Sequence, residues 1–262
     1  DSTAPLVVSR RNAQEKKPWI SLASIENQVE AEFLRPALLG ESILPYRVFR
    51  PFEAVIPADE NGEMLDASTA LDRGFDRLAG WMRKAEAVWD KNRSSERYQL
   101  IELLDYFAQL SSQFPLGLFR VAYAASGTQP AAVLLKESSA VIEHKLYWAA
   151  PDTIAEAQFL VVILNSETAR QRTAAYQSRG QWGARDFDKV VFNLPIPRFD
   201  AKIALHCDVA AAAVEAEKVA AAVSLPEGIK FQRARKMVRD ALAESGLSQR
   251  IDALVARLLD EA

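Results

Sequence analysis

The spacing of hydrophobic positions changes along the first 150 residues, and each change predicts a different kind of element. Residues 18–57 carry short apolar runs broken by prolines, which predicts short strands and turns because proline cannot donate to a strand ladder. Residues 68 to about 112 place apolar side chains at helical spacing, with a break near 92–95. Strands are expected again at 118–148, with period-two alternation at 119–123.

The rest of the chain is predicted to be mainly helical. Pro151-Asp152-Thr153 is a cap for a helix that starts near Ile154, and the apolar run 159–164 is expected to anchor the core. Residues 201–262 are rich in alanine, the best helix former, and Leu225-Pro226-Glu227-Gly228 divides them into two or three helices. The predicted fold class is α/β (α+β): a mixed curved sheet with packed helices, followed by a helical C-terminal segment.

Composition sets broad bounds. The 262 residues are 49% hydrophobic, enough for one large domain or two small ones, and the net charge of -3 does not indicate a polyanion partner for the chain as a whole. A single cysteine, Cys207, excludes an internal disulfide and suits a reducing compartment, so we expect a cytoplasmic protein. No apolar run reaches the ~20 residues needed to cross a bilayer. Because no Met precedes Asp1, we expect the chain to begin inside a longer polypeptide.

Residues for catalysis are scarce. The adjacent His206-Cys207-Asp208 point different ways on a helix, so they predict a helix-start histidine and a buried thiol rather than a metal site. Asp186 and Asp188 resemble part of a metal-dependent nuclease site, but an isolated acidic pair is more typical of a solvated turn. No Gly-rich phosphate loop of the P-loop type is present.

A basic, glycine-containing stretch is the strongest candidate for binding. Between 170 and 189, five basic residues face two acidic ones, a local charge of +3: Arg170, Arg172, Arg179, Arg185 and Lys189 against Asp186 and Asp188. Arginine can grip guanine or a phosphate with two hydrogen bonds. Gly180 and Gly183 would let the backbone approach a duplex closely.

Not all of these cations are assigned to a ligand. Arg170 and Arg172 are interpreted as the solvated face of a helix, whereas Arg179, Arg185 and Lys189 are the predicted DNA contacts. Trp182 either stacks on a ligand or anchors its loop. A second, weaker group is Arg35, Arg47 and Arg50, for which surface ion pairing is the alternative.

These features occur in a recognisable order. Ile163-Leu164-Asn165-Ser166 comes first, the Gly-rich basic stretch follows, and Asn193-Leu194-Pro195-Ile196-Pro197 closes it; upstream, residues 33–43 read FLRPALLGESI and are followed by Tyr46-Arg47-Val48-Phe49. This order resembles the C-terminal target-recognition (specificity) region of adenine-N6 DNA methyltransferases and of fused type II restriction-modification enzymes. The resemblance covers roughly residues 30–200.

The resemblance implies a DNA target-recognition domain at 1–200, with a helical insertion at about 68–112, and a helical segment at 201–262. It implies binding of double-stranded DNA on behalf of a methyltransferase domain in the same polypeptide. The parent protein would be an adenine-specific DNA methyltransferase that uses S-adenosylmethionine, with or without a fused endonuclease. The fragment itself is expected to be non-catalytic and without cofactor, because it lacks the Asn/Asp-Pro-Pro-aromatic tetrad that holds the target base.

Two other functions stay open. The near-neutral charge and the apolar stripe of residues 231–258 suit a structural module that docks the methyltransferase domain or a second subunit. A nuclease that uses Asp186 and Asp188 is the weaker alternative.

Overall fold

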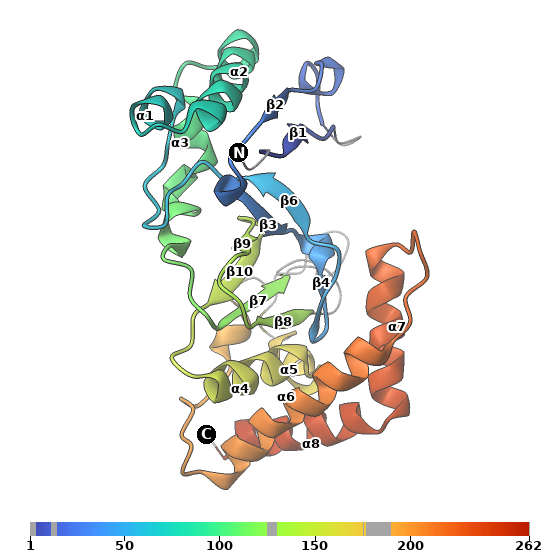
Figure 1. The fold of residues 1–262 in the computed structure, drawn as a ribbon. Helices are drawn as coiled ribbons and strands as arrows, with labels where there is room; N and C mark the ends of the chain where they lie inside the picture. Colours follow the sequence, from blue (N-terminus) through green and yellow to red (C-terminus); the bar gives the residue numbers. More distant parts are fainter. Residues whose placement is uncertain (1–3, 12–14, 125–129, 175, 177–189, 262) are drawn as a thin grey trace. The chain divides into compact units, whose positions relative to one another are not determined.

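The chain forms two compact units. The structure is a computed structural model that describes residues 4–11, 15–124, 130–174, 176 and 190–261 (Figure 1). Unit 1 contains Asp1–Ala37, Glu53–Leu116 and Ser139–Val141, and unit 2 contains Leu38–Phe52, Gly117–Ser138 and Ile142–Ala262. The predicted division at residue 200 therefore falls inside unit 2.

Unit 1 combines short strands with a group of helices. It contains β1 (Leu6–Val8), which pairs antiparallel with β2 (Glu26–Gln28). It also contains most of a three-stranded sheet in which β3 (Leu34–Leu38) lies between β6 (Phe52–Val55) and β9 (Val141–Ile142); the end residues Leu38, Phe52 and Ile142 belong to unit 2. Its helices are α1 (Ala67–Asp72), α2 (Asp76–Asn92) and α3 (Leu100–Leu104), with 3-10 turns at Trp19–Ser21, Ala31–Phe33, Tyr106–Ala108 and Ser111–Gln113. The break predicted near 92–95 coincides with the end of α2.

Acidic side chains fix the starts of the unit 1 helices. The Asp66 carboxylate accepts from the amide of Thr69 at 2.7 Å and caps α1. The Glu30 carboxylate accepts from the amides of Arg77 and Leu78 at the start of α2, at 3.0 and 2.8 Å. Both bonds satisfy amide groups that a helix leaves free in its first turn.

Unit 2 contains a three-stranded sheet, with β7 in the middle, and a two-stranded sheet. Strand β7 (Arg120–Ala124) pairs antiparallel with β8 (Ala132–Leu135) and with β10 (Leu146–Ala149), and β4 (Ile43–Leu44) pairs with β5 (Arg47–Val48). The predicted period-two alternation does not give β7 one exposed and one buried face, because every residue of β7 is buried. Contacts with α4 and β4 cover this strand.

Helix α4 (Ile154–Asn165) is the centre of unit 2. The Thr153 hydroxyl accepts from the amide of Glu156 and caps the helix where the sequence predicted its start. Val161, Val162 and Ile163 have no exposed surface. Such complete burial is typical of a helix that is hydrophobic on every side, and each of these side chains stabilises the fold by about 1.5–3 kcal/mol. Helix α4 contacts β7 and β8 as well as the C-terminal helix α6 (Ala204–Ala222) (Figure 1).

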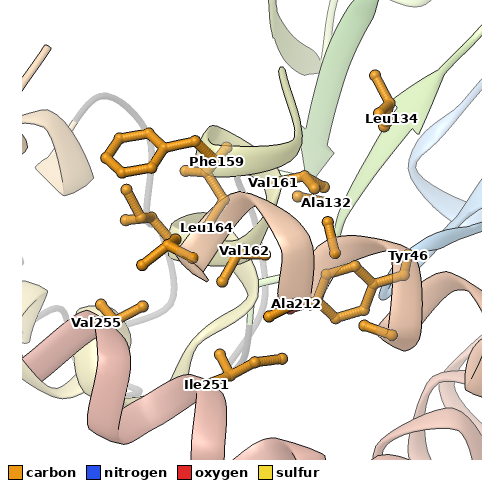
Figure 2. Close-up of a cluster of buried hydrophobic side chains, with 14 of the residues drawn as sticks. Tyr46, Ala132, Leu134, Phe159, Val161, Val162, Leu164, Ala212, Ile251 and Val255 are labelled. Carbon is orange, nitrogen blue, oxygen red and sulfur yellow. The ribbon is translucent and has the colours of Figure 1, made fainter. Parts of the chain in front are cut away.

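The alanine-rich segment packs into this same core. Ala212, Ala213 and Ala216 of α6 are fully buried, and their small side chains let α6 lie close to α4. Helices α7 (Phe231–Glu244) and α8 (Leu247–Asp260) pack on α6, and Ile251 and Val255 of α8 join the same cluster (Figure 2). The C-terminal segment is therefore part of the unit 2 core.

The predicted fold class is confirmed: the chain is a mixed α/β protein with a helical C-terminal part. In the described residues the strands form small sheets of two or three strands. The remaining helical pieces of unit 2 are α5 (Glu167–Thr173) and the 3-10 turns at Gly40–Ser42 and Val190–Asn193. Within the described ranges, no helix has the length and apolarity to cross a membrane.

The close approach of α4 and α6 gives a test. Replacing the buried Ala212 with Leu should lower the free energy of unfolding by about 1–3 kcal/mol, because the added volume overpacks the core. The neighbouring Ala211 is exposed, so Ala211→Leu should change stability by less than about 0.5 kcal/mol. Urea unfolding measures both variants, and equal effects at the two positions would contradict this packing.

Candidate nucleic-acid interface

The predicted DNA contacts fall mostly outside the part of the chain that the structure describes. This applies to Arg179, Gly180, Trp182, Gly183, Arg185 and Lys189, and to the acidic pair Asp186 and Asp188. Their roles stay predictions. The residues before and after 177–189, which we call the basic segment, are described, and they show how the chain is packed on either side of it.

The Asn165-Ser166 step that precedes the basic segment joins α4 to β8. The Asn165 carboxamide accepts from the amide of Ala132 and donates to the carbonyl of Ala132, both at 2.9 Å, and it also donates to the Val161 carbonyl at 3.0 Å. The side chain thereby imitates a neighbouring strand at the end of β8. The Ser166 hydroxyl donates to the Ile163 carbonyl at 2.9 Å and accepts from the amide of Ala169 at 3.0 Å, which caps α5.

The two arginines of α5 are engaged in ion pairs. Arg170 bonds the carboxylate of Glu167 in the first turn of the same helix. Arg172 pairs with Asp260 at the end of α8, at 2.8 Å. Both guanidinium groups are already neutralised within unit 2, so they do not add to a free positive surface.

The basic segment leads into a second anchored stretch. After the 3-10 turn Val190–Asn193, Val191 and Leu194 are buried in the unit 2 core at 6% exposure each. The Ile196 amide donates to the Leu194 carbonyl at 2.8 Å. The buried Thr173 on one side and Val191 on the other therefore fix both ends of the basic segment to the same core.

Among the second predicted group, Arg47 has a clear structural task. Its Nη1 donates to the carbonyls of Ala220 and Val223, at 2.9 and 2.8 Å. These carbonyls lie at the C-terminal end of α6, where a helix leaves its last acceptors unsatisfied and where positive charge is favoured. Arg47 is thus a cap for α6, a contact that joins residues more than 170 positions apart.

Arg35 and Arg50 have different surroundings. Arg35 is half-buried in unit 1 with its guanidinium 5.3 Å from the centre of the Phe114 ring. Arg50 is exposed in unit 2, lies 4.7 Å from the centre of the Phe49 ring, and reaches the Pro226 carbonyl only at 3.5 Å. Neither forms an ion pair with a carboxylate in the described ranges. The alternative of surface ion pairing is therefore not found for these two arginines in the described ranges, and their assignment to DNA stays a prediction.

The backbone of Arg50 is itself unusual. Its φ of 44° places a residue with a Cβ in the left-handed region, which costs about 1–2 kcal/mol for residues other than glycine. A cavity of about 430 Å³ lies beside this residue. Sequence patterns could not predict that cavity, because its walls come from segments about 180 positions apart.

The histidine and cysteine near the start of α6 are placed differently from each other. His206 is buried, and its Nδ1 accepts from the amide of Asp200 at 3.0 Å, so the expected helix-start histidine is confirmed as a hydrogen-bonding residue. The prediction of a buried thiol was wrong, because Cys207 is exposed; its thiol donates to the Ala201 carbonyl at 3.3 Å. Consecutive helix residues point about 100° apart, which separates the two environments. Across the described ranges, no cluster of three potential metal ligands is found.

The cap made by Arg47 can be tested by substitution. Arg47→Ala should lower the free energy of unfolding by about 1–3 kcal/mol, because two carbonyls lose a charged donor. Arg233→Ala, which removes an exposed arginine of α7, is the matched control and should change stability by less than about 0.5 kcal/mol. Urea unfolding gives both values, and an Arg47 variant as stable as the control would show that the cap contributes nothing.

Comparison with known proteins adds no family assignment. No protein-family model matches the sequence, and no curated protein matches it.

Proposed function

We propose that this chain recognises a sequence in double-stranded DNA, as the target-recognition fragment of an adenine-N6 DNA methyltransferase-type restriction-modification protein. The observation that carries the proposal is the fixed order of motifs. Ile163-Leu164-Asn165-Ser166 comes first, the basic Gly-rich stretch follows, and the Leu194-Pro195-Ile196-Pro197 element closes the series.

The structure of unit 2 supports this interpretation of the motif order. Asn165 and Ser166 hold α4, β8 and α5 together, and Leu194 is buried in the same core. The two ends of the motif series thus have structural roles, and the proposal assigns the basic residues between them to DNA. A binding segment carried by a rigid scaffold is a common arrangement for recognition.

The charge distribution requires the DNA contact to be local. The chain carries a net charge of -3, whereas the stretch 170–189 carries +3. Arg170 and Arg172 are paired with carboxylates of unit 2. The proposal therefore rests on Arg179, Arg185 and Lys189, with close backbone approach at Gly180 and Gly183 and Trp182 within the same turn.

The chemistry of methyl transfer is assigned to another part of the parent protein. The closest sequence to the catalytic tetrad is Asn193-Leu194-Pro195-Ile196, which lacks the second proline and the aromatic ring. Leu194 is also buried in the core, so this stretch is not free to hold a flipped base. S-adenosylmethionine and the methyltransferase domain belong to the parent polypeptide in this proposal.

Of the two observations that favoured the assembly function, the near-neutral charge remains, whereas the apolar stripe is accounted for by packing within unit 2. The apolar stripe of residues 231–258 is represented by Ala234, Val238 and Leu258, and all three are buried within unit 2. These side chains are occupied by the packing of α6, α7 and α8 on one another. DNA recognition is accordingly the function we propose.

DNA binding by this segment predicts a strong salt dependence. The chain should bind duplex DNA at low salt, and the affinity should fall steeply with salt concentration because phosphate contacts release counterions. Replacing Arg179, Arg185 and Lys189 together with Ala should flatten the slope of log affinity against log salt by roughly 2–3, which corresponds to three lost phosphate contacts at about 0.9 each. Fluorescence anisotropy with a labelled duplex measures both quantities.

A charge-matched triple variant is the control for this experiment. Lys218, Arg233 and Lys236 are exposed on the C-terminal helices, so Lys218→Ala/Arg233→Ala/Lys236→Ala removes the same charge elsewhere on unit 2. This control should keep its DNA affinity to within about threefold, since distant exposed charges are screened. If both triple variants weaken binding equally, the assignment to residues 179–189 is wrong; if the unmodified chain does not bind duplex DNA at low salt, the proposed function itself fails.

A further inference from the structure

A cavity in unit 2 is lined by aromatic and charged residues that are not among the predicted DNA contacts at 179–189. It is an open cavity with a volume of about 430 Å³, and its lining includes Glu41, Phe49, Arg50, Phe52, Lys230 and Phe231. All of these residues belong to unit 2. Small-molecule sites commonly have volumes of about 300–1,000 Å³ with apolar and aromatic walls and a few polar groups.

Aromatic rings form the apolar part of the wall. Phe49 is buried at 8% exposure, whereas Phe52 and Phe231 are half-buried. Guanidinium groups lie over two of these rings: Arg50 lies 4.7 Å from the centre of Phe49, and Arg235 lies 5.1 Å from the centre of Phe231. The buried Arg235 is held by the carbonyls of Ile43 and Gly40, at 2.8 and 2.7 Å, so the ring of Phe231 rests on a fixed support.

Two cations at the cavity have no carboxylate partner in the described part of the chain. Arg50 and Lys230 are both exposed, and neither takes part in an ion pair there. The left-handed backbone of Arg50, with φ at 44°, is a conformation that glycine would adopt without strain. Strained backbone of this kind is often found at ligand-binding positions, and here it occurs at an exposed arginine beside the cavity.

The start of α7 adds donors to the same wall. Lys230 is the N-cap residue of α7 and provides no side-chain cap. Along the start of α7, Ala234 is the first residue whose amide has a backbone acceptor; it donates to the Lys230 carbonyl at 3.0 Å. The earlier amides, including those of the lining residues Phe231 and Gln232, have no such acceptor in the described residues. Free amides at a helix start favour an anion.

We propose that this cavity binds a nucleoside 5′-monophosphate group. The base stacks on the rings of Phe52 and Phe231, and the phosphate is held by Lys230, Arg50 and the first amides of α7. The Glu41 carboxylate accepts a hydrogen bond from a hydroxyl or amino group of the ligand. This inference stands apart from the proposed DNA contacts at residues 179–189, because it needs neither that segment nor a duplex.

Titration with adenosine 5′-monophosphate tests the site. Isothermal titration calorimetry of the whole chain should show saturable binding of this nucleotide. Adenosine and inorganic phosphate should each bind at least about tenfold more weakly, because each supplies only one half of the contacts. Absence of binding at millimolar nucleotide, or equal binding of adenosine and its monophosphate, would overturn the proposal.

Variants separate the phosphate contacts from folding. The double change Arg50→Gly/Lys230→Gln should weaken the nucleotide by about tenfold or more. It should leave Tm unchanged or raise it, since glycine relieves the left-handed backbone. Lys236→Gln is the matched control, because Lys236 is an exposed lysine of α7 outside the cavity, and its nucleotide affinity should stay the same. A double variant that binds as tightly as this control contradicts the site.

The ring contact has its own variant. Phe231→Leu keeps an apolar side chain and removes the aromatic face, so it should weaken the nucleotide while leaving the weak binding of inorganic phosphate unchanged. Equal losses for both ligands would show that Phe231 does not stack on a base. Near-UV circular dichroism of this variant checks that unit 2 keeps its packing.

The bound group can come from free nucleotide or from a nucleotide of DNA. The Arg50→Gly/Lys230→Gln variant is therefore also titrated with duplex DNA. Unchanged DNA affinity beside a lost affinity for the free nucleotide assigns the site to free nucleotides, and a parallel loss assigns it to a nucleotide of the DNA. The Arg179→Ala/Arg185→Ala/Lys189→Ala variant should bind the free nucleotide normally, so a failure of the DNA proposal is distinguishable from a failure of this one.

Discussion

The burial of the second half of α4 is the constraint on which unit 2 depends. Val161, Val162 and Ile163 have no exposed surface, so something apolar must cover every side of the helix. Strands β7 and β8 and the alanine face of α6 provide that cover. At the end of α4, Asn165 bonds both backbone groups of Ala132 and so fixes the helix to β8. Burial of these apolar side chains stabilises α4, and the Asn165 carboxamide fixes the position of the end of α4 against β8.

This constraint gives the two ends of the motif series a structural role. Asn165 and Ser166 hold α4, β8 and α5 in place, and Leu194 returns the chain to the same core. Arg170 and Arg172 are neutralised by Glu167 and Asp260. The cations that the proposal assigns to DNA are those of residues 179–189, between two anchored ends. The cavity at the start of α7, which we propose as a nucleotide site, is lined by other residues.

Local signals in the sequence predicted much of the fold. Thr153 marks the start of α4, and the Pro226 to Gly228 step separates α6 from α7, because caps and helix breakers act on their immediate neighbours. Contacts between distant residues could not be predicted in this way. The cap that Arg47 makes on α6 and the exposure of Cys207 both depend on how helices pack. Of the two candidate sites, the basic segment was predicted from the sequence. The cavity was not predicted, because its aromatic rings come together only in the folded unit.

Hydrogen exchange of the chain with and without duplex DNA tests the central claim most directly. The account predicts that peptides covering residues 177–189 exchange more slowly when DNA is bound. Peptides from the second half of α4 should exchange slowly in both states, because that helix is buried in the core of unit 2. Saturating DNA that leaves residues 177–189 unchanged, while slowing exchange only elsewhere in the chain, would contradict the account.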